Sequence, residues 1–458
     1  MNTSKRNFNM LAVDIGAGSG RLVLGKYSAG ELSLTEVERF EHRDCLINGI
    51  LYWDFQDIFN KVKDGIRKAI ASVEHLDSIG FDSFAPDFVC FSELGQPVGN
   101  MLSYRNFQHE TVLKDVLSVV SSKSFTEICG NKPLSFSLLS QLVFIQKSGL
   151  LPSNTKIIPM PLANALGYLF SGRFHTDRTQ SSISMLSDRH GNWSKALVDH
   201  FIQPPLQLPE IMPCGEMLGQ LVLDGTVTDT TVINVGSHDT ACANGLLAAS
   251  ASEELLINSG TWISVGTATN APITTDCICR SGLYNYGLPD GGNLLCRLSY
   301  GMGLIRTLRS RMYIYDYEAN YALLGMLADS STYDQYFSVY EPDLFTSEHP
   351  IEVTIQSILR QRGKPAPECF ADIVRCVYTS LTENIAGCIL DLQKATGRHF
   401  VSAYLGGGGV QDQYFVRRIE ERTGLSVISM PIESTAIGNI RMQLHAFGVN
   451  SEALEIIS

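Results

Sequence analysis

Long apolar runs, paired cysteines and positive charge are all scarce in this 458-residue chain. No stretch reaches the roughly 18 apolar residues that a membrane-spanning helix requires, so we expect no membrane partner. The first residues, MNTSKRNFNMLAVD, lack the apolar core of a secretory signal. The 11 cysteines form no CxxC pair, which argues against structural zinc. Their odd number favours reduced thiols and therefore a cytoplasmic location.

Basic residues are outnumbered, with 35 Lys and Arg against 47 Asp and Glu and a net charge of −12. Nucleic-acid binding depends on clustered cations that neutralise phosphates, so we expect no nucleic-acid partner. The 44% hydrophobic content is ordinary for a globular protein, and the length predicts two domains. The sequence leaves open whether the protein is a monomer or a homodimer.

Strand and helix patterns alternate along most of the chain, which predicts an α/β fold. The clearest series is an amphipathic helix over 369–397, a strand over 400–405, a glycine loop, a helix over 412–424, a strand over 425–430 and a helix over 433–448. In sheets of this kind the ligand site lies at the C-terminal ends of the strands.

The N-terminal pattern is strand, glycine turn and strand, followed by a third strand over 31–42. A Pro- and Gly-rich connector at 203–226 separates it from a similar series. That series has a strand, a turn with an aspartate and a helix over 231–249, and then a hairpin over 253–269. We therefore predict two domains built on one plan, an N-terminal domain over 1–234 and a C-terminal domain over 235–458.

The first candidate site is DIGAGSGR, residues 14–21. Its glycines allow consecutive N–H groups to converge on an anion. A P-loop is excluded because the required lysine is missing, and a dinucleotide-binding turn is disfavoured because a β-like segment follows instead of a helix. A plain hairpin turn remains an alternative. We interpret the loop as a hairpin that grips phosphate, with Asp14 facing a magnesium ion through water, since Mg²⁺ takes only one or two carboxylates.

The second candidate site is GSHDTA, residues 236–241, which places Asp239 between a strand and a helix. In that position an aspartate can accept a proton from a substrate hydroxyl during attack on phosphorus. The alternative is that Ser237 or Asp239 only caps the helix. Two further loops favour the catalytic interpretation. NSGTW (258–262) has the form of a phosphate-sized turn, and four glycines at 406–409 would let a nucleotide base or ribose lie against bare backbone.

Taken in this order, the motifs resemble the FGGY family of carbohydrate kinases, and within it the rhamnulokinase branch. The similarity extends from Leu11 to about Gly448 and includes DIGAGSGR, SIGFDSFAPDFV, GSHDTA, SGTW, GGGGVQD, ESTAIGNI and YEPDLF. The resemblance implies two actin- and hexokinase-like (ribonuclease H-like) α/β domains that enclose a cleft. It also implies ATP-dependent phosphorylation of a ketose at a primary hydroxyl, with Mg²⁺ as cofactor. L-Rhamnulose, converted to L-rhamnulose 1-phosphate, is the first-choice substrate.

The resemblance also implies roles for individual residues. Asp239 would be the general base and would touch the sugar, Asp14 would serve Mg²⁺, and Asp87 would bind sugar hydroxyls. The other sugar contacts would be Ala85, His238, Thr240 and Tyr300. The ATP side would consist of Ala17, Gly18, Ser19, Gly20, Arg21, Gly260, Thr261, Leu308, Gly407, Gly408 and Gly409.

The chain departs from the branch pattern mainly on the sugar side. Phe84-Ala85-Pro86 stands where the branch commonly has Trp-Gly-Val, and four further positions differ: Asn106, Leu162, Tyr286 and Tyr300. On the nucleotide side Leu308 and Asp412 differ. Buried polar partners in a sugar pocket cannot be left unpaired, so such changes alter which hydroxyl pattern is accepted. ATP use is therefore better supported than L-rhamnulose.

Three alternatives stay open. The acceptor could be another ketose or a polyol, with L-fuculose and L-ribulose as examples. The chain could be a non-catalytic sugar sensor on the same fold, although retention of both Asp14 and Asp239 argues against this. It could also be an actin-like filament ATPase, but the sugar-contacting strand pair would have no role there.

Overall fold

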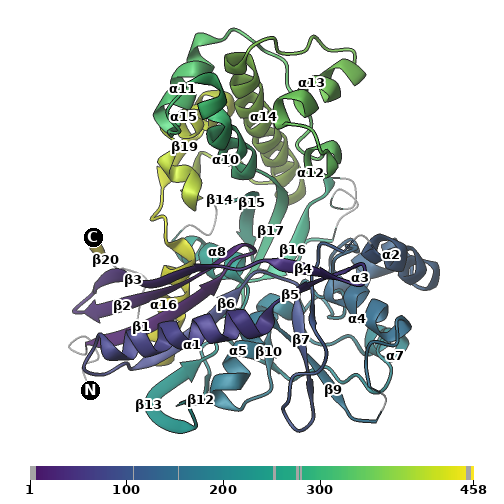
Figure 1. Cartoon of the computed structure of the whole chain (residues 1–458), viewed down its shortest axis with the longest axis vertical. Coiled ribbons are helices and arrows are strands. Elements are labelled where there is room, and N and C mark those ends of the chain that lie inside the picture. Colours follow the sequence, from purple (N-terminus) through teal and green to yellow (C-terminus); the bar gives the residue numbers. More distant parts are fainter. Residues whose placement is uncertain are drawn as a thin grey trace.

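The computed structural model describes residues 7–106, 108–152, 154–250, 254–274, 278, 281–449 and 455–457. Within them, two separate β-sheets form the centres of two mixed α/β domains, which Figure 1 shows one above the other. In the residues so described, no helix is both long enough and apolar enough to cross a membrane.

The first sheet contains seven strands: β1 (Phe8–Ile15), β2 (Ser19–Ser28), β3 (Glu31–Glu41), β6 (Ser78–Ser83), β12 (Met217–Leu223), β13 (Thr226–Ile233) and β20 (Glu455–Ile457). Their order is β12-β13-β6-β1-β2-β3-β20. Strands β1, β2 and β3 are antiparallel neighbours, whereas β6 is parallel to β1 and β13 is parallel to β6.

Short strands and helices complete this part of the chain. The strands are β4 (Asp44–Ile47), β5 (Ile50–Trp53), β7 (Phe88–Ser92), β8 (Met101–Leu102), β9 (Ile157–Pro161), β10 (Thr176–Asp177) and β11 (Ile211–Met212). The helices are α1 (Phe55–Ala71), α2 (Gln108–Val119), α3 (Ser122–Cys129), α4 (Leu138–Lys147), α5 (Leu162–Ser171), α6 (Arg178–Ser181), α7 (Lys195–Phe201) and α8 (Asp239–Ser250).

The second sheet contains β14 (Leu255–Ser259), β15 (Trp262–Thr269), β16 (Tyr284–Gly287), β17 (Asn293–Tyr300), β18 (Ser402–Gly406) and β19 (Ser426–Ser429). Their order is β16-β17-β15-β14-β18-β19. The helices that follow β17 are α10 (Met302–Arg311), α11 (Tyr321–Ser330), α12 (Asp343–Thr346), α13 (Ile351–Gln361), α14 (Phe370–Thr396), α15 (Gln413–Thr423) and α16 (Ser434–Ala446). Short 3-10 turns cover Met312–Tyr315 and Gly408–Gln411.

The two sheets share one connection pattern, as the sequence predicted. In each, the first strand is central, two antiparallel strands extend one side, and two parallel strands extend the other. One detail of the prediction is wrong. Residues 231–249 were expected to open the second series, but β13 pairs with β6 in the first sheet and the second sheet begins at β14. A local strand-turn-helix pattern cannot indicate which sheet its strand joins.

Alternate residues of β1 pack on opposite faces of the first sheet. Leu11, Val13 and Ile15 lie in a core with α1 and α5, whereas Met10 and Ala12 pack with α16. Asp14 follows the even-numbered residues and therefore shares the face that α16 covers. Helix α16 thus packs on the first sheet, and beside α8, although the second sheet precedes it in the chain.

The contact between α8 and α16 leaves no room for a side chain at Gly438. A Cβ atom there would stand 2.1 Å from the backbone carbonyl oxygen of Cys242. We expect Gly438→Ala to lower the free energy of unfolding by about 1–3 kcal/mol, the usual cost of overpacking. Urea denaturation followed by circular dichroism measures this change.

Gly387 in α14 is the matched control, because the nearest atom to an added Cβ is Arg297 Nη2 at 3.9 Å. Gly387→Ala should be neutral or stabilising by about 0.5–1 kcal/mol, since alanine is the better helix former. Equal stability of the two variants would contradict the close packing of α8 against α16.

Candidate active site

Three aspartates stand where two parallel strands end and a helix begins. Asp14 near the end of β1 is in register with Asp82 near the end of β6, and Asp239 is the first residue of α8. The backbone joins these segments, because the Ser83 N–H donates to the Ser237 carbonyl at 2.9 Å. Burial, and next the negative charge of Asp14, raise the pKa of both Asp82 and Asp239. The three carboxyl groups therefore form one electrostatic unit.

Sequence reasoning missed Asp82, which is the fully buried member of this group. Its Oδ2 accepts a hydrogen bond from Asn439 Nδ2 of α16 at 2.6 Å, while Oδ1 has no hydrogen-bond partner in the described structure. Gln443 continues the network by donating to Asn439 Oδ1 at 2.7 Å and to the Leu11 carbonyl at 3.0 Å. The pairing of β1 with β6 is the signal that would have identified Asp82, and it is a long-range property.

Asp239 is the most accessible of the three aspartates. Its side chain is 23% exposed, against 6% for Asp14, and Asp82 has no exposed surface. The backbone N–H and the hydroxyl of Thr240 both donate to Asp239 Oδ1. Burial and the charge of Asp14 raise the pKa of Asp239 to about 6. An accessible carboxylate with this pKa can accept a proton from a bound hydroxyl near neutral pH.

His238 lies next to this base, with its Nε2 3.6 Å from Asp239 Oδ1. Burial lowers the pKa of His238 to about 4, so the imidazole is neutral at pH 7. Its ring meets Tyr286 edge-on at 5.5 Å, and its Nδ1 has no hydrogen-bond partner among the described residues. A neutral ring with an unused nitrogen is suited to hydrogen bonding with a polar ligand.

The first loop is a hairpin, as predicted. The Gly16 N–H donates to the Ser19 carbonyl at 3.0 Å. His42 Nε2 donates to the Gly16 carbonyl at 2.7 Å, and Arg105 Nη2 donates to the Ala17 carbonyl at 2.9 Å. Gly18 is exposed with open space around it. The sides of the loop are thus held while its tip is free to meet a ligand.

Arg21 connects this hairpin to the aspartates. Its Nε and Nη2 donate to Asp14 Oδ2 at 2.8 and 2.6 Å, and its Nη1 lies 3.0 Å from Glu433 Oε2. The charges of Asp14 and Glu433 raise the pKa of the guanidinium further above its usual range. Arg21 therefore carries a permanent positive charge beside Asp14.

The second and third loops follow two parallel neighbours, β14 and β18, and lie against each other. Ser259 Oγ donates to the Gly406 carbonyl at 2.6 Å. Gly407 has a φ of +81°, and a Cβ there would stand 2.8 Å from Asn258 Oδ1. Gly408 has no atom within 4 Å of an added Cβ and is exposed. Gly407 thus allows the third loop to approach the second loop closely, whereas Gly408 leaves an open surface.

The start of α10 adjoins the second loop, since the Met302 N–H donates to the Gly260 carbonyl at 3.1 Å. Thr261 is exposed beside it. Tyr300, predicted as a sugar contact, lies next to this loop, with its ring 5.6 Å from that of Trp262. Leu308, assigned to the ATP side, is fully buried in the apolar core of the second domain. Its side chain packs in that core and is therefore not exposed at the candidate site.

Asp87, to which the resemblance assigns sugar binding, accepts hydrogen bonds from protein groups in this structure. It is fully buried, and both carboxylate oxygens already accept hydrogen bonds. Trp53 Nε1 and the Tyr104 N–H donate to Oδ2 at 2.6 and 2.9 Å, and Gln141 Nε2 donates to Oδ1 at 2.8 Å. Burial raises the pKa of Asp87 to about 7. In this structure Asp87 fixes the positions of Trp53, Tyr104 and Gln141.

Several departures from the branch pattern have local structural reasons. Asn106 accepts from the Leu51 N–H and donates to the Leu51 carbonyl, which an aspartate could not do. Leu162 is fully buried, and Phe84 stacks on His42 beside Trp53 and Tyr104. Phe84 also joins the first loop, because its N–H donates to the Ile15 carbonyl at 2.7 Å. Ala85 is partly exposed next to this aromatic group.

A magnesium ion fits the pair Asp14 and Asp82. In the described residues, no group of three or more His, Cys, Asp or Glu side chains is placed to hold a metal ion. Mg²⁺ needs fewer protein ligands, because it keeps several waters and takes one or two carboxylates. Two carboxylates in register, with the buried Asp82 Oδ1 lacking a partner, match that requirement.

Two solved structures share the fold. A gluconate kinase from Lactobacillus acidophilus has a TM-score of 0.78 at 15% identity, with 98% of this chain and 91% of that chain covered. The glycerol kinase of Plasmodium falciparum, solved with ADP, has a TM-score of 0.77 at 14% identity, with coverages of 97% and 91%. These similarities support the two-domain α/β fold expected from the sequence.

Two relatives found by sequence comparison are also named as sugar kinases. A rhamnulokinase from Halalkalibacterium halodurans is 27% identical over 447 residues, which cover 96% of this chain and 93% of the relative. A rhamnulokinase from Mannheimia succiniciproducens is 27% identical over 453 residues, with coverages of 98% and 92%. Residues 9–244 match the N-terminal domain of the FGGY family of carbohydrate kinases, and residues 255–447 match its C-terminal domain. The chain therefore belongs to the FGGY family of carbohydrate kinases.

Proposed function

We propose that the protein transfers the γ-phosphoryl group of ATP to the primary hydroxyl of a ketose, with L-rhamnulose as substrate and L-rhamnulose 1-phosphate as product. The observation that carries this proposal is Asp239, an accessible carboxylate with a pKa of about 6 at the start of α8. The 27% identity to two rhamnulokinases over nearly the whole chain supports the choice of sugar. We also propose a cytoplasmic location, with residues 1–234 as the sugar side and 235–458 as the nucleotide side.

In the proposed reaction, Asp239 takes the proton of the sugar hydroxyl as its oxygen attacks the γ-phosphorus. The P–O bond to the β-phosphate breaks, and ADP leaves with the electron pair. His238 and Thr240 position the sugar near this base. Asp14 and Asp82 would hold Mg²⁺, which when bound would supply neutralisation of phosphate charge.

On the donor side, the backbone N–H groups of Ala17 to Gly20 and the Arg21 guanidinium face the phosphates. Gly260 and Thr261 close the other side, and the open backbone at Gly407–Gly409 receives the base and ribose. The two glycine-lined surfaces come from different sheets, so movement of the two domains towards each other would exclude water and limit ATP hydrolysis.

A panel of ketoses and polyols with coupled detection of ADP tests the substrate. L-Rhamnulose should give the highest kcat/KM, ahead of L-fuculose, L-ribulose, D-xylulose and glycerol. A higher kcat/KM for another ketose would change the assigned substrate but leave the proposed mechanism intact. A kinase for another ketose is the second candidate function, because Phe84 and Asn106 differ from the branch pattern. Sugar binding with no turnover on any panel member would instead indicate a sensor.

The pH dependence of the reaction follows from the raised pKa of Asp239, which is about 6. A general base acts only when deprotonated, so kcat/KM should fall about tenfold per unit as the pH drops below that value, and should level off above pH ~7. Initial rates between pH 5 and 9 test this. The pH dependence of the residual activity of Asp239→Asn gives the contribution from protonation of ATP itself, which is then subtracted from the wild-type profile. An identical acidic limb in that variant would remove Asp239 as its source.

A further inference from the structure

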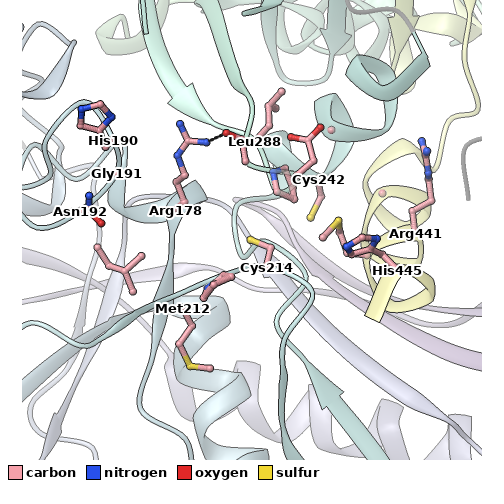
Figure 2. Close-up of a pocket in the computed structure, with 18 of the residues that line it drawn as sticks. Arg178, His190, Gly191, Asn192, Met212, Cys214, Cys242, Leu288, Arg441 and His445 are labelled. Carbon is pink, nitrogen blue, oxygen red and sulfur yellow. Dashed lines mark hydrogen bonds between the residues drawn. The ribbon is translucent and has the colours of Figure 1, made fainter. Parts of the chain in front are cut away.

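A cavity of about 930 Å³ lies apart from the residues of the proposed active site. Its walls come from both domains. The first domain contributes α6, the 190–192 loop and the segment around Cys214, whereas the second contributes the turn between β16 and β17. Helices α8 and α16 form the remaining wall (Figure 2). The volume is in the range that proteins use for small-molecule ligands.

Two arginines and one carboxylate line the cavity, although the whole chain has a net charge of −12. Arg178 and Arg441 carry the positive charge, and the imidazoles of His190 and His445 add polar ring nitrogens. The single acidic residue of the lining is Asp290, whose Oδ1 accepts the N–H of Gly292 in its own turn at 2.9 Å. Figure 2 shows Arg441 and His445 on α16, with Arg178 on the facing wall. The lining thus has a net positive charge, with two arginines against one aspartate, which favours an anionic ligand.

Arg178 is built into its position. Its aliphatic stem packs between two glycines, since a Cβ at Gly191 or at Gly287 would stand 2.8 Å from Arg178 Cγ. Its Nη1 donates to the carbonyls of Gly291 and Gly292, the latter at 2.7 Å. Its Nε is shielded from solvent and has no hydrogen-bond partner among the described residues. Arg178 is half-buried, and the carboxylate of Asp290 attracts it electrostatically. A further anion at the unpartnered Nε would gain from this partly desolvated cation.

The rest of the lining is largely apolar, with Met212, Leu288, Pro289 and Met442 among the residues. Inorganic ions alone would leave these surfaces uncovered. A ligand with an organic body and one or more acidic groups would cover them and also meet the arginines.

We propose that this cavity is a second binding site, for a metabolite-sized organic anion that carries a phosphate ester or several carboxylates. The site is linked to the catalytic centre through its walls. Helix α8 begins with Asp239 and presents Cys242 and Gly245 to the cavity, and α16 holds Asp82 through Asn439 while presenting Arg441 and His445. A ligand in this cavity also touches both domains, so its binding would favour one relative arrangement of the domains over others.

Calorimetric titration of the full chain tests the proposal, with 3-phosphoglycerate, ribose 5-phosphate, citrate and inorganic phosphate as probes. Excess MgADP is present throughout to occupy the nucleotide side. We expect at least one organic probe to bind with a Kd below about 1 mM and more tightly than inorganic phosphate. The phosphate-ester and carboxylate probes distinguish the two sources of negative charge.

Two variants locate the binding. Arg178→Gln removes the half-buried cation, and His445→Glu places a carboxylate at an exposed position of the lining, where it should not disturb folding. Each should weaken binding about tenfold or more. Arg422→Gln, which makes the same charge change at the exposed pair with Glu383, should bind as the wild type does. Absence of binding to the wild-type protein, or equal affinity in His445→Glu, would overturn the proposal.

Discussion

Asp239→Asn should lower kcat by about 10²–10⁴-fold, the range typical for loss of a general base. The amide cannot take the hydroxyl proton, yet it keeps the size of the side chain and can still accept the hydrogen bonds of Thr240. The KM values for sugar and ATP should therefore change little. Coupled ADP release at saturating substrates gives kcat, and calorimetry gives the affinity for each substrate.

Asp199→Asn on α7 is the matched control, because the same substitution there affects only an exposed pair with Lys195. It should leave kcat unchanged. If Asp239→Asn retained wild-type sugar-dependent turnover while folded normally, the assignment of the base would be wrong. A loss of turnover together with lost sugar affinity would point instead to a binding role.

Neutralising Asp14 is expected to have the next largest effect. Asp14→Asn should lower kcat by about 10²–10³-fold, because it removes a carboxylate proposed to hold Mg²⁺ and leaves Arg21 with weaker anchoring. The Mg²⁺ concentration that gives half-maximal rate should rise at constant ATP. Titration of MgCl₂ in the coupled assay measures this shift.

A second consequence separates the electrostatic role of Asp14 from simple misfolding. The negative charge of Asp14 helps to raise the pKa of Asp239, so its removal should move the acidic limb of the residual activity to lower pH. Asp64→Asn, at an exposed pair on α1, should change neither quantity. A normal Mg²⁺ requirement and an unmoved limb in Asp14→Asn would contradict both roles.

Local patterns predicted much of this fold. The hairpin at 14–21, the glycine cap after α14 and the strand-loop-helix around Gly406–Gly409 each depend on residues close in sequence. The sheet to which β13 belongs could not be predicted, because strand partners are chosen over long distances. For the same reason the sequence did not single out Asp82, whose significance comes from its register with Asp14.

Carrying residue roles across by resemblance had a different weakness. Leu308 stands where the resemblance implies an ATP contact, but it is the seventh of the ten residues of α10 and its apolar side chain is buried in the core. Asp87 has the expected carboxylate, which is buried and accepts from three protein donors, so its contact with sugar stays a prediction. Both outcomes depend on neighbours that no short motif contains.

Helix α16 has a consequence for the order of events during synthesis. It covers Met10, Ala12 and Val23 of the first sheet and supplies Asn439, which bonds the buried Asp82. All of the second sheet leaves the ribosome before residues 434–446 do. Until then, one face of the first sheet remains bare and a carboxylate destined for burial lacks its partner. The nascent N-terminal half should therefore be a client of chaperones, completing its core only after the second domain has been made.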